Sequence, residues 1–327
     1  MNMLKANRLV SGGVITNYKC SSKCKHCSYS CSPSWERDYM DKEVADRIFK
    51  TLKSKGCYSV HIGGGEPFLE PDKLINVLES ANKNGINVEY IETNGSWFTD
   101  KGKVKSILSD LKDHGVDTLL ISIDPFHNEY IPFGKAKGLI EACYSSGVKV
   151  FPWQMDFWPD LNSFDDKKTH SLKEYENKFG KKYVETLPNR YGINLKGRAF
   201  KTFKPLLKTE SYDNIISTQR PCGLLSGVYH FHVDLYSNFI PQSCPGFSIN
   251  FNEVVKGADS KKYEVIYNLE TKGVAGLADL AVNKYGYKPK AEYAGKCDLC
   301  YDIRNFLVID LDLDLPDLKP KGHYKFV

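Results

Sequence analysis

Three cysteines near the start of the chain, Cys20, Cys24 and Cys27, have the residue type and spacing needed to hold a metal cluster. Thiolates are the soft ligands that bind iron–sulfur clusters, and three on one short loop can hold three irons of a 4Fe-4S cube while the fourth iron keeps no protein ligand. Such an open iron can bind a substrate or cofactor. A fourth cysteine, Cys31, follows, but gaps of three, two and three residues differ from the two, two and three of ferredoxin-type runs. Cys31 is therefore expected to be a small buried or loop thiol.

A glycine-rich corner follows the next apolar run, with the sequence Gly63-Gly64-Gly65-Glu66-Pro67. A CxxxCxxC loop followed by a strand that ends in GGEP resembles the radical S-adenosylmethionine (SAM) superfamily. The resemblance implies a 4Fe-4S cluster whose open iron chelates the amino and carboxylate groups of SAM, and a corner that contacts the SAM amino group. The residue before the third cysteine, usually aromatic in that family, is His26, whose flat ring can still face adenine.

The chain then alternates between strand and helix patterns. Expected strands cover residues 14–17, 59–62, 88–92, 118–123 and 148–153, with a sixth near 193–195. Expected helices cover residues 41–56, 71–84, 101–114 and 136–146. Strands separated by amphipathic helices imply parallel βαβ units and an α/β fold. This pattern matches the partial (β/α)6 TIM-type barrel of the radical SAM family, which is open on one side.

Polar residues follow the expected strands, at the edge where parallel α/β folds carry their chemistry. Asn94 follows the third strand, and Ser122 and Asp124 alternate with apolar residues at the end of the fourth, so both face inward. The resemblance implies SAM contacts here, with Ser122 and Asp124 on the ribose hydroxyls and Arg198 on the carboxylate. The alternatives are a turn-starting Asp124 and a solvated Arg198.

Three histidines, His127, His230 and His232, are further candidates for bases or ligands. A lone histidine near the rim of an active site is more often a hydrogen-bonded structural residue. The sequence therefore assigns no catalytic side chain.

Four later cysteines form a second set, Cys222, Cys244, Cys297 and Cys300. They accompany an expected hairpin over 229–235 and 239–241 and a helix over 277–285. A late CxxC fits a redox dithiol, half of a zinc site or half of an iron–sulfur site, and four thiols suffice for one complete metal site. The arrangement resembles the Twitch domain, a short SPASM-like α+β unit that holds one auxiliary 4Fe-4S cluster. We therefore expect a barrel over 1–205 and a Twitch domain with a C-terminal tail over 206–327.

Composition and charge narrow the possible partners and the cellular location of the protein. The net charge is +5, from 45 Lys and Arg against 40 Asp and Glu, and the basic residues are scattered, which indicates a mixed solvated surface without a nucleic-acid partner. No signal peptide and no apolar run of the roughly 18–20 residues that span a membrane is present. A cytoplasmic protein is expected, in which ten cysteines favour metal over disulfides.

The resemblance implies an enzyme that uses SAM and two 4Fe-4S clusters to take a hydrogen atom from a substrate carbon, with electrons from a flavodoxin- or ferredoxin-type reductant. Residues 27–33 and the single auxiliary site resemble peptide epimerases and related maturases of ribosomally made peptides. The length and single auxiliary cluster also resemble the sugar-alcohol dehydrogenase of aminoglycoside biosynthesis. With nineteen residues before Cys20, no leader-recognition domain is expected. A peptide substrate is favoured over a small alcohol or aminocyclitol, and over a non-enzymatic electron carrier.

The neighbours of Cys244 bear on the outcome of the reaction. In the epimerases that the chain resembles, a cysteine beside an auxiliary-cluster ligand returns a hydrogen atom to the substrate. Here the neighbours are Ser243 and Pro245. A hydroxyl O–H bond is too strong to give its hydrogen to a carbon radical, and proline has no labile hydrogen. Net oxidation or cross-linking is therefore expected, with Cys31 as the remaining spare thiol that can approach the cavity.

Overall fold

The computed structural model covers residues 1–327 and describes all of them except 1–2, 7–8, 219, 226–229 and 242–243. Its main sheet has eight strands in the order β10-β9-β8-β2-β3-β4-β5-β6. The six neighbouring strands from β8 to β6 are all parallel. They are β2 (Ser11–Ile15), β3 (Ser59–Gly63), β4 (Asn87–Thr93), β5 (Thr118–Ser122), β6 (Lys149–Trp153) and β8 (His230–Asp234).

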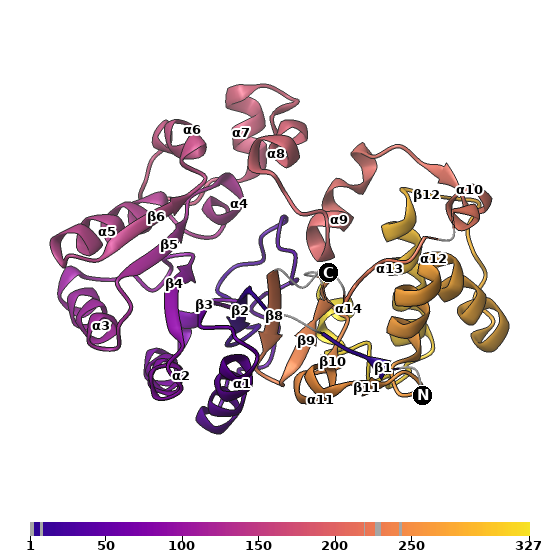
Figure 1. The fold of residues 1–327 in the computed structure, drawn as a ribbon. Helices are drawn as coiled ribbons and strands as arrows, with labels where there is room; N and C mark the ends of the chain where they lie inside the picture. The colour runs from indigo at the N-terminus through magenta and orange to yellow at the C-terminus, as the bar shows by residue number, and fades with distance from the viewer. Residues whose placement is uncertain (1–2, 7–8, 219, 226–229, 242–243) are drawn as a thin grey trace.

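Amphipathic helices cover the outer side of this sheet (Figure 1). They are α1 (Lys42–Ser54), α2 (Pro71–Lys83), α3 (Lys101–Asp113) and α5 (Phe133–Ser145). In α1 the buried residues Ala45, Ile48, Phe49 and Leu52 recur at helical spacing and form one apolar face. Gly56 lies just after the end of α1 and has a φ of 80°. Residues with a Cβ disfavour this backbone conformation, so a glycine here helps to end the helix. The predicted alternation of parallel strands and helices is confirmed.

The predicted sixth strand near 193–195 is wrong. Helix α8 (Tyr183–Tyr191) ends there and α9 (Gly197–Phe203) begins after a short irregular segment. The sixth parallel strand is instead β8, which pairs with the edge of β2 that faces away from β3. Three residues, Ile193-Asn194-Leu195, carry too little periodicity to identify a strand, and here they line cavities.

The same sheet continues into the last third of the chain. Strand β9 (Asn238–Ile240) pairs antiparallel with β8, as the predicted hairpin requires, and β10 (Ile249–Asn250) pairs with β9. The helix expected over 277–285 lies within α12 (Glu264–Tyr285). Two small sheets join β1 (Met3–Leu4) to β11 (Ala258–Asp259) and β7 (Glu210–Ser211) to β12 (Glu292–Tyr293). The main sheet contains strands from both sides of residue 205. The division into a barrel over 1–205 and a Twitch domain over 206–327 therefore remains a proposal.

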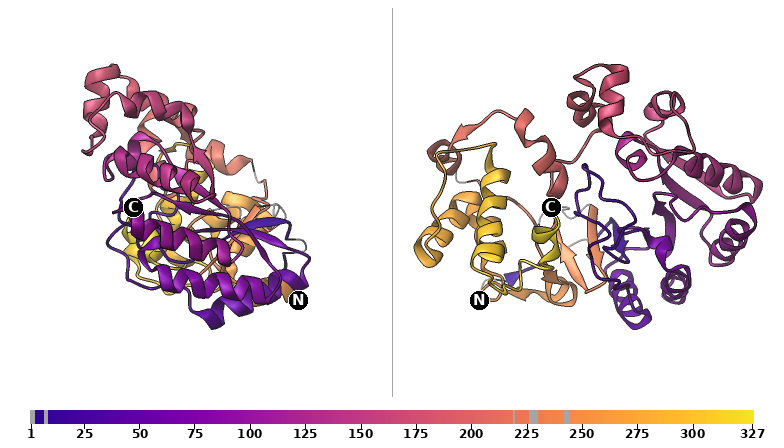
Figure 2. Two further views of the ribbon diagram at one scale, coloured as in Figure 1. Left: turned by 90° about the vertical axis from the view of Figure 1, so that its left-hand side faces the viewer. Right: turned by 180° about the vertical axis from the view of Figure 1, so that it is seen from behind.

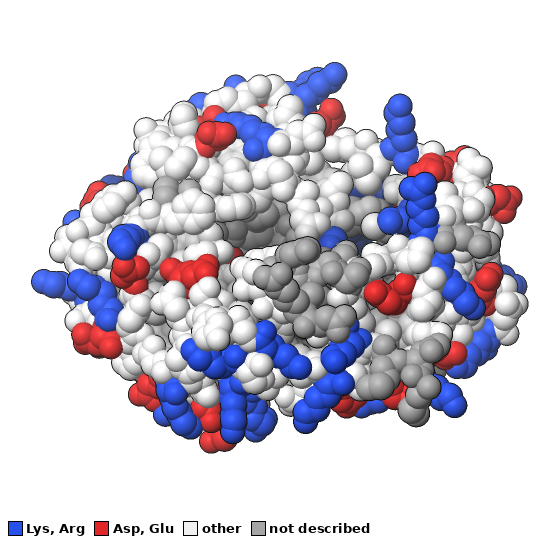
Figure 3. Space-filling view, viewed as in Figure 1, with Lys and Arg blue, Asp and Glu red and all other residues white. Residues whose placement is uncertain are grey.

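The remaining helices fall into two groups that Figures 1 and 2 show on opposite sides of the molecule. After β5 come α4 (Pro125–Asn128), α6 (Trp158–Asn162) and α7 (Leu172–Phe179). On the other side lie α10 (Tyr212–Ser217), α11 (Phe251–Lys256), α13 (Lys296–Asn305) and α14 (Gly322–Lys325). None of the helices in the described part of the chain is both long and apolar enough to cross a membrane. Figure 3 shows basic and acidic residues interspersed on the visible face, without a block of one sign.

A buried carboxylate ties the β8–β9 turn to the segment after β2. Asp234 is fully buried, and its Oδ2 accepts hydrogen bonds from the Tyr18 hydroxyl at 2.9 Å and the Asn238 side chain at 3.1 Å. Its Oδ1 accepts the backbone N–H groups of Tyr236 and Asn238, each at 2.9 Å. Four donors thus depend on one acceptor group.

We predict that Asp234→Ala lowers the free energy of unfolding by about 2–4 kcal/mol, because buried donors lose their acceptor. The measurement is urea unfolding followed by circular dichroism. Asp279→Ala, on the exposed side of α12, is the control and should change stability by less than about 0.5 kcal/mol. Equal unfolding midpoints for the two variants would contradict this role of Asp234.

Candidate active site

A cavity of about 590 Å³ opens where the parallel strands end, and Cys20, Cys24 and Cys27 all line it. Gly64 and Gly65 of the glycine corner line the same space. The two motifs, far apart in sequence, therefore meet at one site. Among described residues, the only groups of three or more His, Cys, Asp or Glu donors that lie within 4.8 Å of one another contain no cysteine. The thiols are thus spread more widely than the ligands of a single ion, whose sulfur atoms would lie roughly 3.8 Å apart around zinc.

The glycine corner lies directly against the backbone that leads into the cysteine loop. The Gly65 N–H donates to the Asn17 carbonyl at 2.8 Å, and the Glu66 N–H donates to the Lys19 carbonyl at 3.1 Å. A Cβ on Gly65 would lie 2.7 Å from the Tyr18 carbonyl oxygen and closer still to that of Lys19. Only glycine permits this approach, so the corner fixes where the loop begins.

Glu66 and Pro67, which were expected to contact a cofactor, lie behind the cavity wall and are not among the described residues that line it. The Glu66 carboxylate accepts hydrogen bonds from the Thr93 hydroxyl at 2.9 Å and the Asn94 N–H at 2.8 Å. Burial raises the pKa of Glu66 to about 7, against the effect of these donors. Glu66 therefore positions Asn94, whose amide lines the cavity and donates to the Cys20 sulfur at 3.4 Å.

Arg198 differs most from its expected role. Its guanidinium is buried and donates to the carbonyl oxygens of Cys24 at 2.9 Å, Ser30 at 2.8 Å, Cys31 at 3.0 Å and Phe326 at 2.9 Å. It is absent from the described residues that line the cavity. Neither the predicted contact with a SAM carboxylate nor the solvated alternative fits this geometry. Arg198 instead ties the middle and the last residues of the cysteine loop to Phe326.

Asp124 also lies behind the cavity wall and is not among the described residues that line the cavity. It is fully buried, accepts the His127 N–H at 2.9 Å at the start of α4, and lies 2.7 Å from His127 Nδ1. This is the turn-starting alternative rather than a ribose contact. Although burial raises it, the pKa of Asp124 falls to about 2 because His127 and His26 lie beside it. His127 in turn donates to the Cys24 sulfur, so Asp124 orients a hydrogen bond to a predicted cluster ligand.

His26 and Ser122 do line the cavity. The His26 ring stacks on Phe126 with centroids 4.5 Å apart, and it meets Tyr191 and His127 in edge contacts with centroids 4.9 and 5.1 Å away. Burial lowers the pKa of His26 to about 4, so the ring is neutral near pH 7. Both residues therefore remain candidates for contact with an adenosyl group.

Cys31 is buried, as expected, and it also lines the cavity. Its thiol donates a hydrogen bond to the Cys27 sulfur, and this contact lowers the pKa of Cys27 to about 6. A fourth sulfur therefore lies beside the three-cysteine set, inside the space where a substrate would bind.

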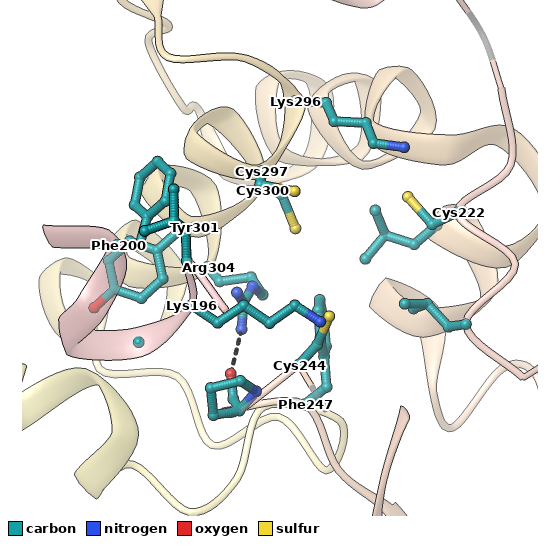
Figure 4. A pocket seen from close by; sticks show the side chains of 15 residues that line it. Lys196, Phe200, Cys222, Cys244, Phe247, Lys296, Cys297, Cys300, Tyr301 and Arg304 are labelled. Atoms are coloured by element: carbon teal, nitrogen blue, oxygen red, sulfur yellow. Dashed lines mark hydrogen bonds between the residues drawn. The ribbon is translucent and has the colours of Figure 1, made fainter. Parts of the chain in front are cut away.

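A second cavity, of about 160 Å³, is lined by Cys222, Cys244, Cys297 and Cys300 (Figure 4). Cys297 and Cys300 project from the first turns of α13, while Cys222 and Cys244 come from irregular segments on other sides of the space. Buried Arg304 lies beneath them, 4.1 Å from the Phe247 ring centre and hydrogen-bonded to the Pro245 carbonyl at 3.1 Å. The four predicted ligands thus share one site. Ser243, which entered the oxidation argument, lies outside the described residues.

Sequence reasoning missed His61 and Glu92, which line the large cavity together with His230 and His232. Strand alternation carried the signal for His61, since its neighbours Val60 and Ile62 face the helices and the residue between them must face inward.

Comparison with known proteins agrees with this geometry. Residues 14–145 match the Radical SAM superfamily. These residues form a radical SAM domain. The matched residues include the cysteine loop, the glycine corner and Asn94, whereas Arg198 and β8 lie beyond them.

Individual relatives align over parts of the chain. A putative peptide biosynthesis protein, YydG of Bacillus subtilis (strain 168), is 28% identical over 124 residues, which is 38% of each chain. The GTP 3′,8-cyclase of Limosilactobacillus fermentum is 29% identical over 113 residues, 34% of this chain and 32% of the cyclase. The alignments thus span about a third of these curated relatives. The crystal structure of Streptococcus suis SuiB bound to S-adenosylmethionine has a TM-score of 0.41 and 15% identity, and the match covers 72% of this chain and 60% of SuiB.

We predict that Arg198→Lys destabilises the protein by about 2–4 kcal/mol, because an ammonium group cannot reach four carbonyl oxygens that a planar guanidinium serves. Urea unfolding measures the loss, and iron retained after anaerobic desalting should fall with it. Arg47→Lys, on the exposed side of α1, is the matched control and should leave both values unchanged. A stable Arg198→Lys variant with normal iron content would show that the clamp is dispensable.

Proposed function

We propose that the protein is a radical SAM enzyme that takes a hydrogen atom from a carbon of a ribosomally made peptide. The observation that carries this proposal is the meeting of three thiols and the glycine corner at one cavity, within residues that match the superfamily. A cavity of about 590 Å³ is within the usual range of roughly 300–1,000 Å³ for ligand pockets.

Cys20, Cys24 and Cys27 would hold the SAM-binding cluster, which fits their wide spacing. Gly64, Gly65, Asn94, Ser122 and His26 would contact SAM, since all five line the cavity. When bound, the reduced cluster and SAM together supply a 5′-deoxyadenosyl radical. The chain's own contribution is to fix the loop through Arg198, orient the cofactor and enclose the substrate carbon.

The peptide substrate is supported by the name of one relative, the putative peptide biosynthesis protein YydG. Because that alignment covers 38% of each chain, substrate and partners are proposals. A flavodoxin- or ferredoxin-type protein would supply electrons, in a cytoplasmic setting where thiols stay reduced. The alternative to a peptide substrate is a small alcohol or aminocyclitol, which the enzyme would dehydrogenate. The cavity would then hold a compact substrate.

The late cysteines would hold an auxiliary 4Fe-4S cluster in a Twitch-like unit. The four thiols line a cavity of about 160 Å³ together with other residues, whereas a single water needs only about 10–15 Å³, so the cavity has room for a group larger than one ion. No three of these donors meet the 4.8 Å limit that the described histidine groups satisfy. Size and spacing therefore both favour a cluster. Buried Arg304 would offset part of the negative charge of four thiolates.

Net oxidation is the outcome we propose, with the auxiliary cluster accepting the second electron. Cys31 supports a second candidate, peptide epimerisation, because a spare thiol lines the cavity and can return a hydrogen atom to a carbon radical. The two candidates differ in whether the product loses two hydrogens or keeps its formula.

Replacing Cys20, Cys24 and Cys27 together with Ala should abolish formation of 5′-deoxyadenosine from SAM, because the open-site cluster loses all its ligands. The variant should keep about four irons, against about eight in the wild type. Anaerobic reconstitution, iron analysis and chromatography provide the measurements. Retained SAM cleavage in the triple variant would refute the assignment of these ligands, and a wild type with about four irons and one zinc would refute the auxiliary cluster.

The fate of the substrate radical can be read from a reaction in heavy water with a peptide substrate. Oxidation predicts a product lighter by two hydrogens, with no solvent deuterium at carbon. A product of unchanged formula that has gained one deuterium would instead support epimerisation. In that event Cys31→Ser should abolish the deuterium uptake if Cys31 is the donor, while 5′-deoxyadenosine still forms.

A further inference from the structure

Three imidazoles gather on the wall of the large cavity, where Tyr29 of the cysteine loop packs against one of them, His232, with ring centroids 5.5 Å apart. His61 lies on β3, and His230 and His232 lie on β8. One ring nitrogen of each lies within 4.8 Å of those of the other two. All three line the cavity that the cysteine loop also lines. The sequence marked His230 and His232 as candidates, but their meeting with His61 depends on strand pairing between segments far apart along the chain.

The sheet register explains how these rings meet. Strand β2 runs between β3 and β8, and its residue Gly13 is the register partner of both His61 and His232. A Cβ on Gly13 would lie 2.6 Å from His61 Cε1 and 2.7 Å from His232 Cδ2. The missing side chain therefore opens the space in which rings from two non-adjacent strands come together. A larger residue here would force them apart.

The remaining neighbours complete a recognisable set of ligands. The Glu92 carboxylate lies 3.7 Å from His61 Nε2, and 43% of its side chain is reached by solvent through the cavity. The His61 ring is nearly parallel to the rings of Tyr90 and His230, with centroids 5.2 and 5.3 Å away. Because imidazole nitrogen lone pairs lie in the ring plane, His61 or His230 must rotate for both to bind one ion. Three imidazoles with a nearby carboxylate or an open position are a donor set typical of zinc.

The protonation of the group also suits a metal ion. Burial lowers the pKa of His61 to about 4, and burial with mutual repulsion lowers the pKa of His230 and that of His232. The rings are therefore neutral near pH 7, which is the form that binds metal. Although the Glu92 side chain is 43% exposed, loss of solvation at the cavity wall raises its pKa to about 7.

We propose that His61, His230 and His232 bind a divalent transition-metal ion, of which Zn²⁺ is the first to test. Imidazole ligands favour zinc and related ions over Mg²⁺ or Ca²⁺, which prefer oxygen. Glu92 or an oxygen or nitrogen atom of the substrate completes the coordination. This site is independent of the proposed clusters, and because it faces the same cavity it would hold a substrate by one of its polar groups.

The test uses the full-length protein after anaerobic iron–sulfur reconstitution, so that the thiols are occupied. The protein is equilibrated with Zn²⁺, desalted and analysed for zinc and iron. The wild type should retain about one zinc per chain. His61→Gln and His232→Gln should each weaken zinc retention by roughly 10-fold or more, with iron unchanged. His114→Gln, at the end of α3, is the matched control and should retain zinc normally.

Two further measurements do not depend on losing a ligand. Zinc X-ray absorption of the wild type should show imidazole nitrogen at about 2.0–2.1 Å, whereas a sulfur shell near 2.3 Å would place the ion on thiols and overturn the proposal. Gly13→Ala keeps every ligand but drives the rings apart, so it too should reduce zinc retention. Failure of the wild type to retain zinc, or equal retention in the wild type and in His61→Gln and His232→Gln, would also overturn the proposal. Iron content and SAM cleavage report separately on the proposed radical SAM function.

Discussion

One buried guanidinium holds the candidate active site together. The loop from Cys20 to Cys31 contains no helix or strand among its residues, so its shape must come from tertiary contacts. Arg198 supplies them by donating to three carbonyl oxygens of that loop and to Phe326. Burying a charge is costly unless it is well hydrogen-bonded, and these four acceptors offset that cost. The positions of the thiols, and therefore any cluster they hold, depend on a residue beyond the matched radical SAM segment.

Strand β8 links the two cavities. On one face it contributes His230 and His232 to the large cavity, and at its end Asp234 fixes the turn into β9. The chain then continues to Cys244, which lines the smaller four-cysteine cavity. Parallel pairing with β2 makes β8 part of the barrel sheet, although it comes late in the sequence. The late segment therefore shapes the large cavity directly, in addition to holding the four-cysteine cavity.

Sequence alone predicted the features that depend on residues close together along the chain. Helical spacing in α1, glycine stops such as Gly56, and the spacing of the cysteines all reflect neighbouring residues, and the fold class follows from them. Sequence alone did not predict the roles of side chains whose hydrogen-bond partners lie far away along the chain. Arg198 and Glu66 were expected to contact a cofactor because they follow strands, yet their polar atoms are taken up by backbone groups of other segments. The position of β8 beside β2 rests on non-local pairing, which no periodicity in residues 230–234 reveals.

The cavity has two chemically different ends, and their separation along β3 constrains the substrate. His61 lies within the strand, and Gly64 follows it at the corner beside the cysteine loop. Three residues of strand rise by roughly 10 Å, and an extended peptide covers the same distance in about three residues. A substrate held at the imidazoles by a polar group would therefore present a carbon a few bonds away to the cysteine end. The peptide substrate that we propose would need only a short extended stretch to lie along β3 between these two groups of residues.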